Sequence, residues 1–195
     1  DLCHGVGSQS VFDVCIQLIE NDLGCKIKSF QFRYKEKYYN QDHIELITTD
    51  EGRQILVEDD RFIQLFVNQQ CLRSSCIKNC KYRCPQRVGD ITIGDFKGLQ
   101  RVFSKMSGNK KNYSTIVFNN SKGKSIYSYL LESMEMYECD IGNIIRYNPV
   151  FGRNNPKETR VGVFFDDFTC NKINAVKKWT NNTELYKRTP KKHEA

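Results

Sequence analysis

Four cysteines lie within fourteen residues of this 195-residue chain, in the stretch "CLRSSCIKNCKYRC". They are Cys71, Cys76, Cys80 and Cys84, and Pro85 follows the last of them. Four sulfurs so close together can form disulfides, bind zinc or hold an iron–sulfur cluster. The chain has nine cysteines, an odd number, and its first residues lack the basic and apolar regions of a signal peptide. We therefore expect a cytoplasmic protein with reduced thiols rather than a disulfide framework.

The spacing of the four cysteines favours iron–sulfur over zinc. Structural zinc sites usually place two residues between the paired ligands of each knuckle, and no neighbouring pair here has that spacing. His4, His43 and His193 are too distant in sequence to suggest a Cys–His finger. The segment from Cys80 to Pro85 repeats the end of the bacterial ferredoxin pattern. Zinc stays open as the alternative.

Basic residues surround the cysteine run. Cations near a thiolate-bound cluster would stabilise its negative charge and raise its potential. The same side chains could equally face water. The residues are Arg73, Lys78, Lys81, Arg83 and Arg87.

Composition limits the other classes of function. The chain is 39% hydrophobic, enough to bury a core, and no apolar run approaches the roughly 18 residues that span a bilayer. Residues 171–195 carry +5 of the net charge of +7, which leaves +2 for the first 170 residues. We read this excess as a basic, largely solvated tail and predict no specific nucleic acid partner.

The elements that position these residues alternate between helices and strands. Helices are predicted over 11–23, ended by Gly24, and over 59–70, which leads into the cysteine run. Further helices are predicted over 121–134, capped by Ser121, and over 160–168 and 173–179. Strands are predicted over 29–34, 43–49, 53–58, 90–96, 114–120 and 136–141. This order indicates an α/β or mixed α+β domain, with a central sheet flanked by helices and an inserted cysteine-rich loop at 71–87.

Three segments of the chain together resemble a known family. In order they are "DLCHGVGSQSVFDVCIQLIE", "CLRSSC" and "DITIGDFKGL". They are similar to the C-terminal domain of the beta-subunit family of coenzyme F-420 (deazaflavin) hydrogenases and dehydrogenases, over about residues 1–170. The resemblance implies an iron–sulfur flavoprotein oxidoreductase or electron-transfer subunit. It would pass electrons between a [4Fe–4S] cluster, FAD and a deazaflavin or other acceptor, together with a redox partner protein or subunit.

The resemblance also implies roles for particular residues. Cys71, Cys76 and Cys80 correspond to cluster ligands, and the fourth ligand is either Cys84 or Cys3. We favour Cys84, because three residues separate Cys76 from Cys80 where the family has two. The remaining cysteines, at positions 15, 25, 139 and 170, are expected to be core or surface thiols.

Three residues are predicted to contact a cofactor. His4 and Gly5 belong to the family's C-H-G motif, although a histidine there could instead cap the following helix. Asp95 ends a predicted strand, where α/β folds place ligand-binding loops, although it could be an ordinary turn residue.

The chain departs from the family pattern in ways that bear on the flavin. Lys97 stands where the family has tryptophan, and the family's N-terminal part, with much of its nucleotide site, is expected to lie outside these 195 residues. We therefore expect the chain alone to bind FAD poorly. The alternative function is a non-catalytic accessory or interaction domain, with zinc or a relict cluster, linked to polysaccharide synthesis. A nucleic-acid-binding zinc module is a third hypothesis, supported only by the basic tail.

Overall fold

The computed structural model divides into two compact units. Unit 1 comprises Asp1–Gly5 and Ser74–Pro156, and unit 2 comprises Val6–Arg73 and Lys157–Ala195. Each contains helices and strands, which confirms the predicted mixed α/β class. The described residues are 3, 5–34, 44–78, 80, 82, 87–96, 98–104, 113–148, 151, 158–181 and 184–186.

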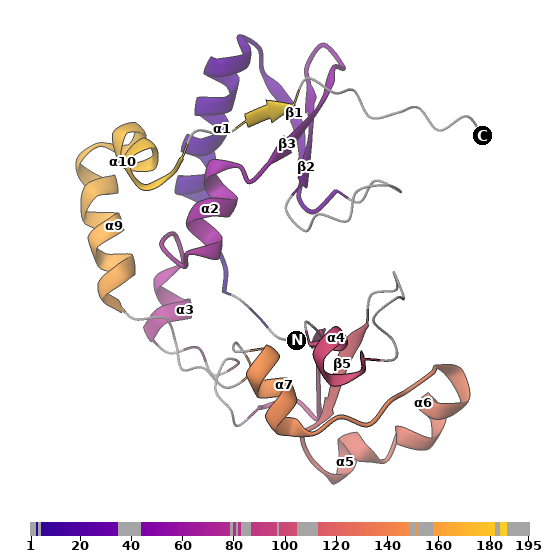
Figure 1. Ribbon diagram of the computed structural model, residues 1–195. Coiled ribbons are helices and arrows are strands. Elements are labelled where there is room, and N and C mark those ends of the chain that lie inside the picture. The colour runs from indigo at the N-terminus through magenta and orange to yellow at the C-terminus, as the bar shows by residue number, and fades with distance from the viewer. Residues whose placement is uncertain are drawn as a thin grey trace. The chain divides into compact units, whose positions relative to one another are not determined.

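Unit 2 has one antiparallel sheet with its helices on one side of it (Figure 1). The sheet has the strand order β1-β2-β3-β6. Its strands are β1 (Ile27–Gln31), β2 (Ile44–Thr49), β3 (Gln54–Glu58) and β6 (Glu184–Tyr186). The helices of the unit are α1 (Gln9–Leu23), α2 (Arg61–Val67), α9 (Glu158–Cys170) and α10 (Lys172–Trp179).

Helix α1 confirms the prediction made from its apolar spacing. Its buried residues recur every three or four positions, so they form one stripe along the helix. Gly24 ends the helix with a φ of 69°, a left-handed conformation that glycine adopts without a steric penalty. The amide of Gly24 donates to the carbonyl of Glu20 at 2.8 Å. The stripe consists of Val11, Val14, Cys15, Leu18 and Ile19.

The sheet buries apolar side chains on both faces. Because side chains alternate along a strand, Ile47 and Val57 point to the face that packs against Ile19 of α1. Leu46 and Leu56 form a second cluster on the opposite face. The predicted hairpin is confirmed, with Ile47 of β2 opposite Ile55 of β3.

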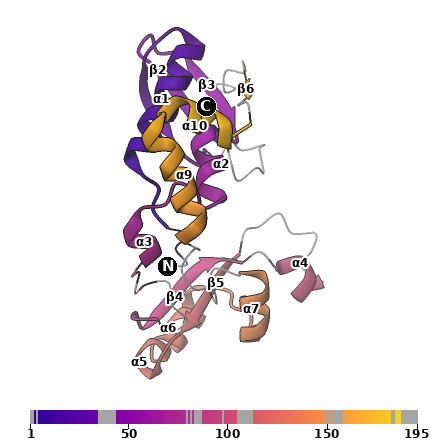
Figure 2. The same ribbon diagram turned by 90° about the vertical axis from the view of Figure 1, so that its left-hand side faces the viewer.

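Helices α9 and α10 complete the core of unit 2 (Figure 2). Phe164 of α9 and Val176 of α10 are fully buried in one cluster with Leu65 of α2 and with the stripe of α1 except Ile19. Both helices were predicted, and both form. Since Val176 lies within residues 171–195, the packed structure extends past the point where we placed the start of the solvated tail. Residues 187–195 lie outside the described residues.

Unit 1 contains a two-stranded antiparallel sheet and several short helices. Strand β4 (Ile91–Asp95) pairs with β5 (Ser114–Phe118), so the described strands form two small sheets where we expected one central sheet. The two predicted strands are confirmed. The helices are α3 (Ser74–Lys78), α4 (Leu99–Val102), α5 (Ser121–Lys124), α6 (Tyr127–Ser133) and α7 (Ile141–Tyr147).

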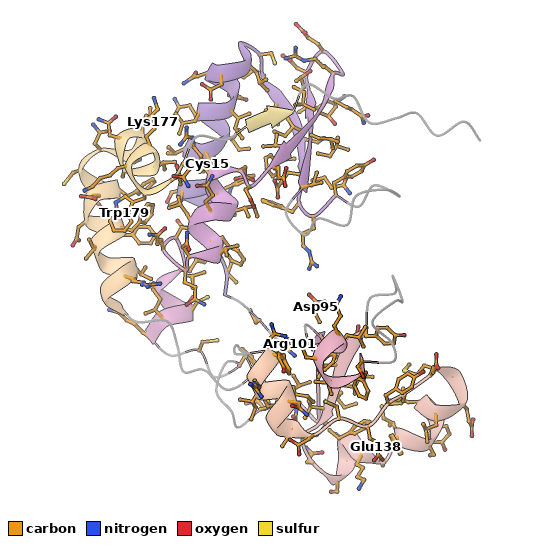
Figure 3. The ribbon with its side chains drawn as sticks, viewed as in Figure 1. Cys15, Asp95, Arg101, Glu138, Lys177 and Trp179 are labelled. Carbon is orange, nitrogen blue, oxygen red and sulfur yellow. The ribbon has the colours of Figure 1, made fainter. Side chains whose placement is uncertain are left out.

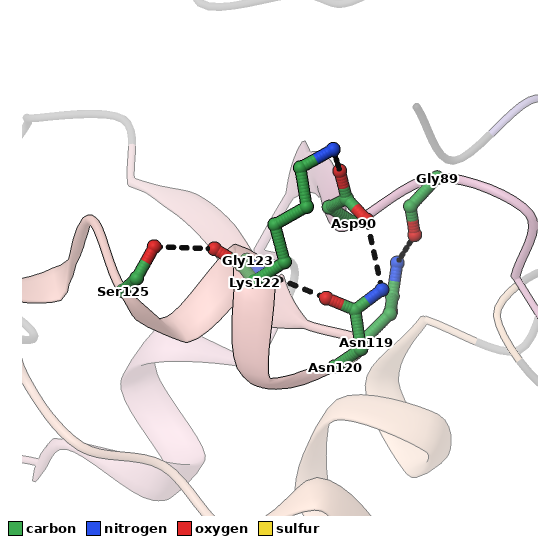
Figure 4. Close-up of polar contacts among 7 residues, drawn as sticks. All are labelled: Gly89, Asp90, Asn119, Asn120, Lys122, Gly123 and Ser125. Carbon is green, nitrogen blue, oxygen red and sulfur yellow. Dashed lines mark hydrogen bonds and ion pairs between the residues drawn. The ribbon is translucent and has the colours of Figure 1, made fainter.

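A polar network joins the start of β4 to the helix after β5 (Figure 4). Asn120 donates to a carboxylate oxygen of Asp90 at 2.8 Å, and Lys122 pairs with the other oxygen of Asp90 at 3.1 Å. The amide side chain of Asn119 donates to the carbonyl of Gly89 at 2.7 Å. These contacts align the ends of the two strands by means of asparagine side chains, which commonly bond nearby backbone and turns.

Two local predictions are wrong in unit 1. Residues 121–134 form two short helices rather than one. The cap is not Ser121 but Asn120, whose side chain accepts from the amide of Gly123 at 2.8 Å. Residues 136–141 do not form a strand. Asp140 accepts from the amide of Gly142 and so starts α7, leaving the residues before it without a ladder partner.

In the part of the chain that the structure describes, no helix has both the length and the apolarity needed to cross a membrane.

Candidate functional site

Of the predicted sulfur ligands that the structure describes, three lie in unit 1. Helix α3 carries Cys76, which is almost fully buried, and Cys80 follows that helix in a half-buried position. Cys3 is also half-buried. All three are free thiols, as a set of metal ligands must be.

A backbone amide near Cys3 donates a hydrogen bond to its sulfur. The amide of Gly5 donates to the Sγ atom of Cys3 at 3.3 Å. Gly5 has a φ of 113°, a backbone conformation that residues other than glycine rarely adopt. Backbone amides that donate to sulfur are among the groups that tune iron–sulfur centres. This contact fits a cluster ligand at Cys3, and the roles of Cys3 and Gly5 stay predictions.

Cys71 belongs to unit 2 and has different surroundings. Its side chain is fully buried in the same apolar cluster as Val11 and Leu65. Burial raises the pKa of the Cys71 thiol to about 12, although the amide of Ser8 acts in the opposite direction. The structure thus gives Cys71 a packing role, and its role as a ligand stays a prediction.

Two of the predicted site residues lie outside the described residues. They are Cys84, a predicted metal ligand, and His4, a predicted cofactor contact. Among the residues that are described, no group of three or more histidine, cysteine, aspartate or glutamate side chains could hold a metal ion. The metal site therefore stays a prediction as a whole.

Arg87, near the end of the cysteine-rich segment, contacts two backbone carbonyls. Its guanidinium donates to the carbonyl of Tyr82 at 2.8 Å and to the carbonyl of Phe151 at 3.2 Å. It also lies over the ring of Phe151, 5.0 Å from the centroid. Arg87, one of the five basic residues around the run, is thus bound to backbone and to an aromatic ring within unit 1. In unit 2, Arg73 likewise donates to a backbone carbonyl, that of Gly7, at 3.3 Å.

The glycine turn ahead of α1 does not fit the pyrophosphate of a dinucleotide. A Cβ atom on Gly7 would lie 2.5 Å from the ring of Phe62, so this glycine allows close packing against an aromatic side chain. The amide of Ser8 donates to the carbonyl of Cys71 at 2.7 Å. A phosphate cradle needs free backbone amides and an open approach. Here the amide of Ser8 is already bonded, and the ring of Phe62 fills the space beside Gly7.

Asp95, the other predicted cofactor contact, is the last residue of β4. It is exposed and lies opposite Ser114 of β5. The next residue, Phe96, donates its amide to the carbonyl of Tyr113 at 3.0 Å and turns its ring into a cavity. The predicted position of Asp95 at a strand end is therefore confirmed, and its contact with a cofactor stays a prediction.

The cavity of unit 1 has a volume of about 520 Å³. Its walls come from β5, α4 and the segment between α6 and α7, on which Figure 3 labels Glu138. Aromatic rings dominate, and neighbouring rings are in contact: the Phe103 and Tyr137 centroids are 5.9 Å apart. The aromatic lining residues are Phe96, Phe103, Tyr113, Phe118, Tyr127 and Tyr137.

A few polar groups also line this cavity. Thr115 is 5% exposed, and its hydroxyl has no hydrogen-bond partner among the described residues. Glu135 and Glu138 are exposed, and the hydroxyl of Tyr137 donates to Glu135. Burial raises the pKa of the Cys139 thiol, which also lines the cavity.

Sequence reasoning missed this cavity. Its aromatic residues are spread between positions 96 and 137 at irregular intervals, so they show neither helical nor strand periodicity. The predicted strand at 136–141 would also have alternated its side chains between two faces. The available signal was compositional, since aromatic residues recur through a segment that otherwise consists of short elements.

Comparison with known proteins gives one finding. Residues 2–143 match the family described as the C terminus of the beta subunit of coenzyme F420 hydrogenase/dehydrogenase. Neither the curated proteins nor the solved structures gave a match. The matched range includes Cys3, the cysteine run and Asp95, and it covers well over half of the 195 residues. The chain therefore belongs to the family formed by the C-terminal domains of coenzyme F-420 hydrogenase and dehydrogenase beta subunits.

Proposed function

We propose that this chain is the iron–sulfur domain of an oxidoreductase subunit and transfers electrons within a larger redox complex. The match to the beta-subunit family over residues 2–143 carries the proposal. Hydrogenases and dehydrogenases catalyse redox reactions, and a beta subunit works with other subunits. A bound [4Fe–4S] cluster would exchange electrons one at a time.

The proposed ligands are Cys71, Cys76 and Cys80, with Cys84 or Cys3 as the fourth. Several observations in unit 1 support a sulfur-ligated centre there. Cys76 and Cys80 are free thiols with limited exposure, which would shield bound sulfur and iron from water. The Gly5 amide bond to the Cys3 sulfur supports Cys3 as the fourth ligand, whereas the altered spacing supports Cys84.

We propose that FAD binding and electron transfer to the final acceptor need the family's N-terminal region or a partner subunit. The turn around Gly7 is packed against Phe62 and does not fit a pyrophosphate. His4, Gly5 and Asp95 stay proposed contacts to FAD or to coenzyme F-420, and no step is assigned to them. We expect the 195-residue chain, purified anaerobically with excess FAD, to lose the flavin on desalting. Recovery of near-stoichiometric flavin would show that the chain alone forms the pocket.

Iron and sulfide analysis tests the proposed cluster. Protein made anaerobically is expected to carry about four iron and four sulfide per chain, with a broad absorption shoulder near about 400 nm. Cys76→Ser and Cys80→Ser should each abolish the cluster, because each removes a thiolate ligand. Cys170→Ser is the matched control, since Cys170 is an exposed thiol of unit 2 and should leave the iron content unchanged.

The fourth ligand is decided by a second pair of variants. If Cys84 is the ligand, Cys84→Ser lowers the iron content and Cys3→Ser does not, and the reverse result assigns Cys3. Full iron in both variants would contradict the proposed ligand set.

The alternative function is a non-catalytic domain that binds zinc and serves in interaction. It stays open because zinc uses the same thiolate ligands as an iron–sulfur cluster, in the same number of four. The same analysis separates the two functions: stoichiometric zinc without sulfide, in a colourless protein, would support the alternative and contradict the redox proposal.

A further inference from the structure

We propose that the cavity of unit 1 is a binding site for a flat aromatic molecule that carries a positive charge. This site goes beyond the proposed redox function, which assigns no role to the residues of the cavity wall.

The size and walls of the cavity suit a single aromatic ring system. Its volume of about 520 Å³ lies within the range of about 300–1,000 Å³ that is usual for small-molecule sites. Phe96, Phe103 and Tyr137 form a continuous aromatic surface, with centroid separations of 6.2 Å and 5.9 Å between successive rings. A planar ligand can stack on such rings or meet them edge to face.

The charged residues around the cavity favour a ligand of positive charge. Glu135 and Glu138 line it, and its described lining includes no lysine or arginine. Carboxylates and the negative faces of aromatic rings both attract cations. They also disfavour phosphate groups, so this site does not suit a dinucleotide. The combination points to an aromatic ring with an ammonium or another cationic substituent.

A pair of probes with the same ring and opposite charges tests the proposal. Tryptamine and indole-3-acetate are titrated into the full chain and followed by ligand-observed NMR at millimolar concentrations. Tryptamine is expected to bind at least about fivefold more tightly, as two nearby carboxylates and an aromatic wall would produce. Equal or tighter binding of indole-3-acetate would overturn the choice of a cationic ligand. Binding of neither probe would overturn the site, as expected if only a protein segment fills the cavity.

Substitutions of the lining residues test whether the probes bind in this cavity. Glu138→Gln should remove most of the preference for tryptamine, and Phe103→Ala should weaken both probes. Glu132→Gln is the matched control, because Glu132 is an exposed carboxylate on α6 outside the cavity lining.

Circular dichroism of each variant separates a loss of binding from a loss of folding. A folded Glu138→Gln variant that keeps the full preference for tryptamine would overturn the proposal, as would an equal loss of preference in Glu132→Gln. Because the test uses indole probes and no metal, it can fail while the iron–sulfur proposal stands, and the reverse also holds.

Discussion

The two units of this chain bury their apolar residues to different extents. In unit 2, each of the four helices has a fully buried residue. These residues are Val11, Leu65, Phe164 and Val176. In unit 1, helix α6 has no buried residue. Many large apolar side chains of unit 1 are exposed, including Ile93, Tyr129, Leu131, Met134, Ile141 and Ile145.

This contrast shows that the units are stabilised in different ways. Unit 2 contains several clusters of buried apolar side chains, so its stability should depend mainly on the fit of those side chains. The described part of unit 1 depends more on particular polar contacts, such as the network around Asp90 and the contacts of Arg87. It also keeps an open cavity walled by aromatic rings. Substitutions in the two units should therefore act through different mechanisms.

The largest effect is expected in the core of unit 2. Phe164→Ala removes a fully buried aromatic side chain that contacts Phe165, Phe168 and Trp179. The expected loss is about 3–5 kcal/mol of unfolding free energy, measured by urea denaturation. Tyr129→Ala is the comparison in unit 1, because Tyr129 is 70% exposed and should change stability by less than about 0.5 kcal/mol. Similar losses in the two variants would contradict the contrast between the units.

A substitution at Gly123 should break the polar network of unit 1. A Cβ atom at this position would lie 2.1 Å from the backbone carbonyl oxygen of Asp90, so α5 would have to move away from β4. Gly123→Ala is expected to cost about 1–3 kcal/mol. Gly162→Ala in α9 is the matched control, because a Cβ atom there meets nothing within 4 Å. It should stabilise the helix by about 0.5–1 kcal/mol, and a loss instead would show that our account of available space is wrong.

The buried carboxyl group of Glu45, in unit 2, has an expected pH signature. Glu45 of β2 is fully buried, and neither of its side-chain oxygens has a hydrogen-bond partner among the described residues. Burial, with the nearby Asp60 carboxylate, raises the pKa of Glu45 to about 9. The folded protein thus keeps this proton at neutral pH, where an unfolded glutamate is ionised.

The sign of the pH dependence follows from that raised pKa. The contribution of Glu45 to stability is fully present below the unfolded pKa of about 4.3 and is lost as pH rises through about 9. Between about pH 7 and 9, unfolding free energy should fall by about 1 kcal/mol per pH unit. Glu45→Gln should flatten this slope, whereas Glu51→Gln, in the exposed turn of the same hairpin, should not. A flat slope in the unaltered protein would contradict a neutral Glu45.

The sequence allowed much of unit 2 to be predicted, because its elements have regular periods. The stripe of α1 and the hairpin of β2 and β3 follow helical and strand spacing closely. Strand β6 was missed, because three residues are too few to show a period. Glu45 occupies the core face next to Ile47, a position where an apolar residue is expected and where no sequence pattern indicates a buried acid.

Unit 1 was harder to predict, for a physical reason. Its short helices are set by side-chain caps, such as Asn120 and Asp140, rather than by long apolar stripes. The predicted ligands were found from motif and spacing, which indicate chemistry but not packing. The full burial of Cys71 in the core of unit 2 was therefore not foreseen. The wall of the cavity arises from contacts between distant segments, which spacing alone does not reveal.

The smallest effect is expected at the surface of unit 2, and its sign is opposite to that of Glu45. Asp167 of α9 accepts from Lys178 and from the indole nitrogen of Trp179, each at 2.7 Å. The bond from Lys178, with that from Trp179, lowers the pKa of Asp167, so its contribution is present at neutral pH and is lost on acidification. Asp167→Asn should therefore reduce the fall in the urea midpoint between about pH 5 and 3, followed by the fluorescence of the chain's single tryptophan. The neighbouring exposed Asp166→Asn is the control and should leave that fall unchanged. If the two variants behave alike, the bonds to Asp167 contribute nothing measurable, and the stability of unit 2 rests on its core alone.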